Sequence, residues 1–253
     1  MKRLVLFIAL LAGNTFAYNL EHRPFTPNIA PARIPLVDFP KPTNQVDANK
    51  KSSQILFETT NTPHARFLIT NDERLNYVDF TFDGRDFLTK APFGTFAEFG
   101  GVLDIKTADL NLDNSPDYII SNWLGGCGLA SGYQNLGFLL SSGDTYKLTT
   151  MIALWPDARD YILIDGKPCI INTSFHEVEE CTDGKNHGFW VYNLLAIDND
   201  QIKLANELHP DFPKTIWYSS APRHDETNLL TDEQKGKLQS DSLKNIFWVP
   251  PHE

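Results

Sequence analysis

The chain has 253 residues, of which 42% are hydrophobic and 12% aromatic, and its formal net charge is −10. This length is enough for one large domain or two small ones with a sizeable core. An acidic chain that has no cluster of Lys or Arg repels phosphate backbones, which argues against a nucleic-acid partner.

Residues 1–17 have the three parts of a secretory signal peptide. Lys2 and Arg3 precede an apolar segment, 4–13, and Thr15-Phe16-Ala17 places small residues where a signal peptidase binds. The apolar segment is too short for a membrane-spanning helix, which needs about 20 residues. We therefore predict cleavage after Ala17, which leaves 236 residues with a net charge of −12 because Lys2 and Arg3 are lost. The mature protein would be periplasmic or secreted and would have no membrane span.

Residues 18–52 are rich in proline, which is excluded from helix interiors and central strands. They predict an extended N-terminal arm that either packs across the domain or stays mobile. Residues 53–253 then form a single β-rich domain, because short apolar or alternating runs follow one another without intervening helices. The clearest runs are 65–70, 76–82, 118–123, 136–140, 161–164, 169–175, 189–197 and 201–204.

Turn residues separate these runs. They are Asp83-Gly84, Ser142-Gly143-Asp144, Asp165-Gly166 and Asp198-Asn199-Asp200. Gly and Asn tolerate positive φ angles and Asp caps its own turn, so we expect hairpins around 165–166 and 198–200. The prediction is a mainly β fold of antiparallel sheets, either a sandwich or a propeller-like meander. A short C-terminal surface helix should follow, with Thr231 as N-cap and Gln234 completing a capping box, ending near Lys244.

Three cysteines remain after export: Cys127, Cys169 and Cys181. Cysteines of exported proteins commonly form disulfides. Cys169 and Cys181 flank an expected strand and its turn and are the first candidates for a bridge. Pairings through Cys127, which lies in a Gly-rich run, remain open alternatives.

The segment from Asp109 to Asp117 is the strongest candidate for a site. Asp109, Asn111, Asp113 and Asp117 place oxygen side chains at relative positions 1, 3, 5 and 9, while Leu110 and Leu112 should point into the core. Calcium takes six to eight oxygen ligands, and a curled loop with a main-chain carbonyl near Ser115 can supply them. Asn114 stands where the loop must turn sharply, at a positive φ. The alternative is a solvated acidic hairpin.

This segment resembles the calcium loop of FG-GAP and VCBS repeats, which carry Asp-x-Asp-x-Asp-Gly-x-x-Asp before a strand. The resemblance covers about 20 residues, from Asp104 to Trp123, and departs from the pattern at Asn111 and Asn114. It implies that Asp109, Asn111, Asp113 and Asp117 bind Ca²⁺. It also implies a β-propeller, which requires several repeats, and the sequence has one loop of this form.

A second polar group follows the run 169–175. His176, Glu177, Glu179, Glu180 and His187 combine imidazole and carboxylate groups suited to a transition metal or to acid–base chemistry. Their spacing fits no metalloprotease motif, so a stapled polar hairpin end is the preferred interpretation.

Aromatic residues are numerous, and packing in the core is the preferred explanation for them. If any aromatic segment contacts a partner, 212–218 is the first candidate. These observations predict an exported, calcium-stabilised β-domain with a non-enzymatic role in binding a protein or a glycan. The alternative is an exported hydrolase that uses His176 and the Glu177–Glu180 cluster.

Overall fold

The computed structural model describes residues 32–42, 52–72, 75–95, 104–125, 132–218, 229–244 and 246–247. The predicted signal peptide, most of the proline-rich arm, Cys127 and Trp248 lie outside these residues. No described helix is both long and apolar enough to cross a membrane.

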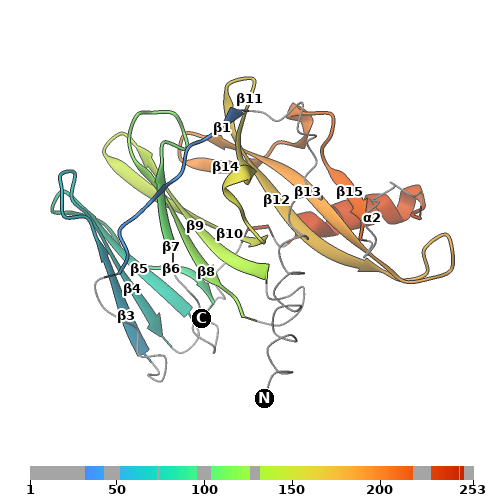
Figure 1. Ribbon diagram of the computed structural model, residues 1–253, viewed down its shortest axis with the longest axis horizontal. Helices are drawn as coiled ribbons and strands as arrows, with labels where there is room; N and C mark the ends of the chain where they lie inside the picture. Colours follow the sequence, from blue (N-terminus) through green and yellow to red (C-terminus); the bar gives the residue numbers. More distant parts are fainter. Residues whose placement is uncertain are drawn as a thin grey trace, which may run out of the picture.

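The described residues form three antiparallel sheets, each built around a four-stranded meander, and these follow one another along the chain (Figure 1). The first comprises β3 (Ser52–Glu58), β4 (Ala65–Asp72), β5 (Leu75–Phe82) and β6 (Arg85–Thr95). The middle sheet comprises β7 (Asp104–Ala108), β8 (Asp117–Trp123), β9 (Tyr133–Ser142) and β10 (Thr145–Leu154). The third comprises β11 (Tyr161–Ile164), β12 (Lys167–Val178), β13 (His187–Asp198) and β14 (Gln201–Leu204).

Short elements extend these meanders. Within the arm, β1 (Ala32–Arg33) pairs with β11 and β2 (Val37–Asp38) pairs with β7, so residues 32–42 connect the third sheet to the middle one. β15 (Lys214–Trp217) pairs with β13. Two 3₁₀ turns, η3 (Ala158–Asp160) and η4 (Asn206–Leu208), complete the connections.

The middle sheet is covered on both faces, and this explains its sequence. Ile119, Leu136 and Phe138 pack toward the third sheet, whereas Tyr118 and Leu139 pack toward the first. A strand buried on both faces is apolar throughout rather than alternating. That is why 136–140 forms a continuous apolar run, and why the fold is a stack of sheets rather than a two-layer sandwich.

The predicted β class, strands and turns are confirmed. All eight predicted runs lie in strands, and those predicted over 161–164 and 201–204 match β11 and β14 at both ends. The helix α2 (Asp232–Leu243) begins with the predicted capping box between Thr231 and Gln234. One side of α2 packs on the third sheet through the buried side chain of Leu238.

The aromatic segment 212–218 belongs mainly to the interior. Phe212 and Ile216 are buried with Trp190 in one apolar cluster, and Trp217 packs beside a second. Trp190 lies 5.7 Å from Trp155 and 5.2 Å from Phe175 between ring centroids. These contacts support the core-packing interpretation for this segment.

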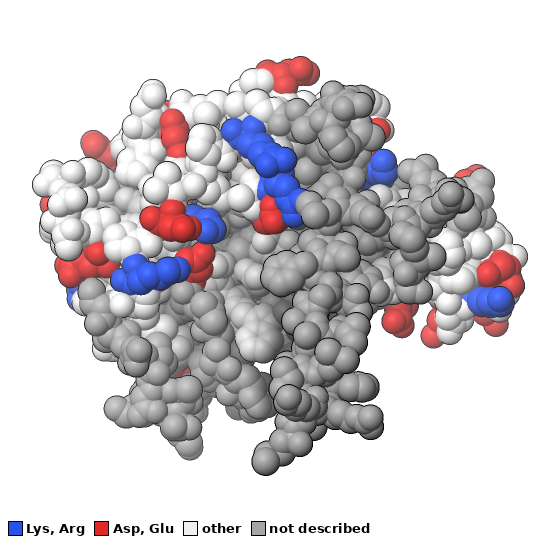
Figure 2. All heavy atoms as spheres, viewed as in Figure 1, with Lys and Arg blue, Asp and Glu red and all other residues white. Residues whose placement is uncertain are grey.

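On the face shown in Figure 2, described Lys and Arg side chains stand beside acidic ones rather than forming one broad positive surface. Lys106, for example, contacts Asp38 at 2.6 Å and Asp104 at 3.3 Å between charged atoms. Exposed pairs of this kind contribute little to stability, about 0–1 kcal/mol each.

Candidate functional site

The acidic loop connects β7 to β8 at one end of the middle sheet. Leu110 is fully buried, as predicted, and anchors the loop to the core. Leu112 is 46% exposed and adopts a φ of 63°, so its predicted inward orientation is wrong: the left-handed turn points its side chain to solvent. Asn114 has a φ of 66°, which confirms the sharp turn expected there.

Asp117 is the buried anchor of this loop. Its Oδ2 accepts hydrogen bonds from the backbone N–H groups of Leu110 (2.7 Å) and Asn111 (3.2 Å). Its Oδ1 accepts from the N–H (2.7 Å) and the hydroxyl (2.9 Å) of Ser141, at the end of β9. Burial raises the pKa of this carboxyl above its usual range, although the four hydrogen bonds oppose that shift.

The other loop carboxylates bind the loop's own backbone. Asp109 accepts from the N–H groups of Asp113 (3.0 Å) and Asn114 (3.1 Å), and Asp113 accepts from that of Ser115 (2.8 Å). The Asn111 amide donates to the carbonyl of Ser141 at 2.7 Å. These contacts curl the loop so that its oxygen-bearing side chains lie close to one another.

Two carboxylates meet at one hydroxyl. Ser141 Oγ lies 3.0 Å from Asp113 Oδ2 and 2.9 Å from Asp117 Oδ1. A hydroxyl carries a single hydrogen and can donate to only one of them at a time. Within the described part of the chain, no ion pair with Lys, Arg or His neutralises Asp109, Asp113 or Asp117. Among these described residues, the three carboxylates of the loop are therefore held by N–H and O–H donors and not by basic side chains.

The donor chemistry of the loop fits calcium, because every side-chain ligand predicted for it offers oxygen. Among the described residues, however, no three His, Cys, Asp or Glu side chains form a group arranged to hold a metal. Each carboxylate oxygen of Asp117 already accepts two hydrogen bonds. Ser141, which joins Asp113 to Asp117, was not predicted; it is 24 residues from Asp117, and only the β8–β9 pairing brings them together.

The predicted bridge between Cys169 and Cys181 is wrong: both are free, buried thiols. The expected strand, 169–175, is longer in the structure: β12 continues to Val178, and a bend at 179–180 precedes Cys181. Nine residue steps at about 3.3 Å each place Cys169 roughly 30 Å from Val178, whereas the Cα atoms of a disulfide lie about 4.4–6.8 Å apart. Burial raises the pKa of the Cys169 thiol to about 11, which keeps it protonated.

The polar cluster after 169–175 does not converge on one point. His176 and Glu177 are neighbours on β12, so their side chains leave opposite faces of the sheet. His187 pairs instead with Asp183, at 2.9 Å between Nε2 and Oδ2. Glu179 and Glu180 are exposed in the turn beyond the strand.

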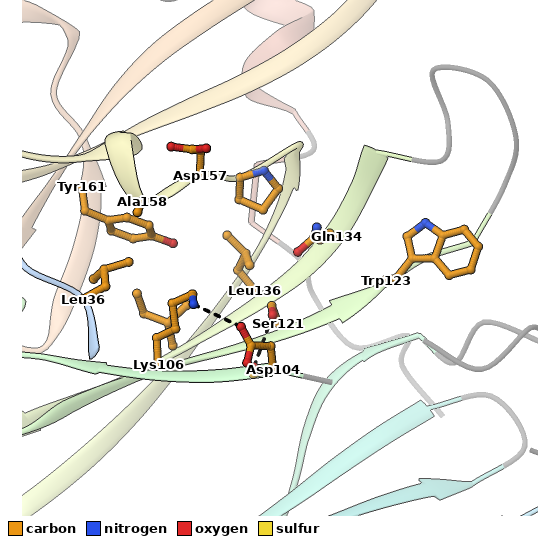
Figure 3. A pocket seen from close by; sticks show the side chains of 12 residues that line it. Leu36, Asp104, Lys106, Ser121, Trp123, Gln134, Leu136, Asp157, Ala158 and Tyr161 are labelled. Atoms are coloured by element: carbon orange, nitrogen blue, oxygen red, sulfur yellow. Dashed lines mark hydrogen bonds and ion pairs between the residues drawn. The ribbon is translucent and has the colours of Figure 1, made fainter. Parts of the chain in front are cut away.

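A pocket of about 380 Å³ lies between the middle sheet and the segment that includes η3 and the start of β11 (Figure 3). Leu36 and Tyr161 lie at one end and Trp123 at the other, with Gln134 and Leu136 between them. Its two carboxylates already have basic partners, Lys106 for Asp104 and Arg159 for Asp157. Apolar walls with a few fixed polar groups are typical of a ligand-binding pocket. The sequence contains no signal for this pocket because its lining comes from five separate segments of the chain.

No protein-family model, curated protein or solved structure matches this chain.

Proposed function

We propose that this chain is an exported β protein that binds one Ca²⁺ ion in the Asp109–Asp117 loop and a small glycan in the pocket of Figure 3. The observation that carries the calcium proposal is the meeting of Asp113 and Asp117 at the single hydroxyl of Ser141. A divalent cation would compensate the charge that these side chains and Asp109 bring together.

Asp109, Asn111, Asp113 and a main-chain carbonyl near Ser115 would hold the ion, and Asp117 would join them by exchanging its hydrogen bond from the Ser141 hydroxyl for the ion. The position of the loop between the first two strands of a four-stranded meander supports the resemblance to FG-GAP and VCBS repeats. Export supports it as well, since extracellular calcium modules bind with dissociation constants of about 10⁻⁴–10⁻³ M.

Calcium should raise the melting temperature of this protein. For a dissociation constant of about 10⁻⁴ M, calcium at 100 times that value stabilises the folded state by about 2.7 kcal/mol. That corresponds to a shift of roughly 5–10 °C for a chain of this size. Thermal unfolding followed by circular dichroism, in EDTA and in about 10 mM calcium, measures it.

Asp113→Ala should abolish this calcium-dependent shift, while Asp144→Ala, which changes an exposed aspartate in the β9–β10 turn, should retain it. If wild-type protein melts at the same temperature in EDTA and in calcium, the loop is a hydrogen-bonded acidic hairpin and not an ion site.

The glycan proposal rests on the composition of the pocket. A sugar has apolar C–H faces as well as hydroxyl groups. The indole of Trp123 can stack on a C–H face, and the side chains of Gln134 and Asp157 can form hydrogen bonds with the hydroxyls. Asp104 pairs with Lys106 and Asp157 with Arg159, and carboxylate oxygens can also accept hydrogen bonds from sugar hydroxyls.

Trp123→Ala should weaken binding of a matching oligosaccharide at least tenfold, which corresponds to about 1.4 kcal/mol. Titration of malto-, cello- and chito-oligosaccharides, followed by tryptophan fluorescence, provides the measurement. Trp155→Phe, which lies in the interior cluster with Trp190, serves as the control. Saturable binding that survives Trp123→Ala would place the ligand elsewhere.

A further inference from the structure

A second cavity, of about 390 Å³, opens where the middle sheet, β12 and α2 meet. Leu124, Tyr133, Ile152 and Ile246 supply its apolar wall, and Ser174 and His176 face it from β12. It shares no lining residue with the pocket of Figure 3.

Ser174 and His176 are two residues apart on β12, so their side chains leave the same face of the strand. His176 Nε2 lies 3.0 Å from Ser174 Oγ, within hydrogen-bond distance. The second contact of the hydroxyl, to the carbonyl of Val191, is longer at 3.5 Å. The serine hydroxyl and the imidazole nitrogen therefore lie within hydrogen-bond distance of each other beside an open cavity.

The surroundings suit the imidazole to act as a base. Partial burial lowers the pKa of His176 and so favours the neutral ring, which accepts a proton at Nε2 when its hydrogen is on Nδ1. Asp241 of α2, another residue of the cavity wall, acts in the opposite direction because its negative charge favours the protonated ring. It pairs with Lys244 at 2.5 Å, which moderates its effect on the ring.

We propose that Ser174 and His176 are a nucleophile and its general base, and that they cleave small carboxylic esters whose acyl group is apolar. The size and apolar wall of the cavity select the acyl group. The proposal is independent of calcium binding and of the glycan pocket. It differs from a site built on Glu177–Glu180, because none of those carboxylates lines the cavity.

The reaction would proceed in two halves. Ser174 Oγ attacks the ester carbonyl carbon while its proton passes to His176 Nε2, and the carbonyl π electrons move to oxygen. Collapse of this intermediate breaks the bond to the alcohol, which leaves with the proton from Nε2, and the acyl group remains on Ser174. Water then attacks the acyl carbon and gives one proton to Nε2. Collapse of this second intermediate breaks the bond between the acyl carbon and Ser174 Oγ, Oγ takes the proton back from Nε2, and the carboxylic acid is released.

An alkyl fluorophosphonate tests this pair directly, since attack by an activated serine forms an O–P bond and expels fluoride. The full-length protein should gain one adduct by intact mass spectrometry, and peptide mapping should place it on Ser174. It should also release p-nitrophenolate from p-nitrophenyl butyrate. Ser174→Ala should lose both signals, and His176→Gln, which keeps the nucleophile, should slow labelling by a factor of about 100 or more.

Ser142→Ala, at the β9–β10 hairpin, is the control and should label at the wild-type rate. The inference is overturned if wild-type protein gains no adduct, if the adduct maps to another residue, or if His176→Gln labels as fast as wild type. The His176→Gln result decides the matter even if Ser174→Ala does not fold.

Discussion

Replacing Asp117 with asparagine should lower the free energy of unfolding by about 3 kcal/mol or more. The wild-type carboxylate is fully buried and accepts four hydrogen bonds from N–H and O–H donors. An asparagine offers one acceptor oxygen, so its amide group would face two of those donors. Each buried donor left without a partner costs about 1–3 kcal/mol. Urea unfolding of both proteins in calcium, followed by circular dichroism, measures the difference.

Asp144→Asn makes the same chemical change at an exposed turn and should leave the free energy of unfolding within about 0.5 kcal/mol of the wild type. If Asp117→Asn is equally mild, then Asp117 does not anchor the loop and its hydrogen bonds contribute little.

Phe67→Ala should lower the free energy of unfolding by about 3–5 kcal/mol. Phe67 is fully buried between the first sheet and the middle one. Its ring centroid lies 4.6 Å from that of Phe80, 5.0 Å from that of Tyr118 and 5.3 Å from that of Phe39. Truncation removes these contacts and leaves a cavity where two sheets meet. Denaturant unfolding measures the loss.

Val37→Ala is the matched control, because Val37 is 64% exposed. It should change stability by less than about 0.5 kcal/mol. A small effect at Phe67 would mean that the first sheet does not pack on the middle one as the structure has it.

Local chemistry made most of the elements predictable. Asp165-Gly166 fixes the β11–β12 hairpin, since both residues adopt positive φ angles there. Thr231 and Gln234 define the start of α2 by satisfying backbone donors that any helix N-terminus leaves free. In each case the information lies within a few neighbouring residues.

Features that depend on distant pairing were not predictable. The free state of Cys169 and Cys181 follows from the length of β12, which continues to Val178 rather than ending at the expected residue 175. Leu112 points outward because its backbone is in the left-handed region, so the side chains of the loop do not simply alternate between core and solvent. Ser141 reaches Asp117 only through the β8–β9 pairing.

The proposed calcium loop and the glycan pocket share two strands. The loop joins β7 to β8, and Asp104 and Lys106 of β7 line the pocket with Ser121 and Trp123 of β8. An ion that orders the loop would hold these strands in register where they form the pocket. Calcium would then support ligand binding through the scaffold without contacting the ligand.

Isothermal titration of EDTA-treated, desalted protein with calcium chloride tests the calcium site directly. We expect one calcium ion per chain, with a dissociation constant of about 10⁻⁴–10⁻³ M, and no binding by Asp113→Ala. Equal heats for wild type and Asp113→Ala, or no binding by the wild type, would contradict this expectation.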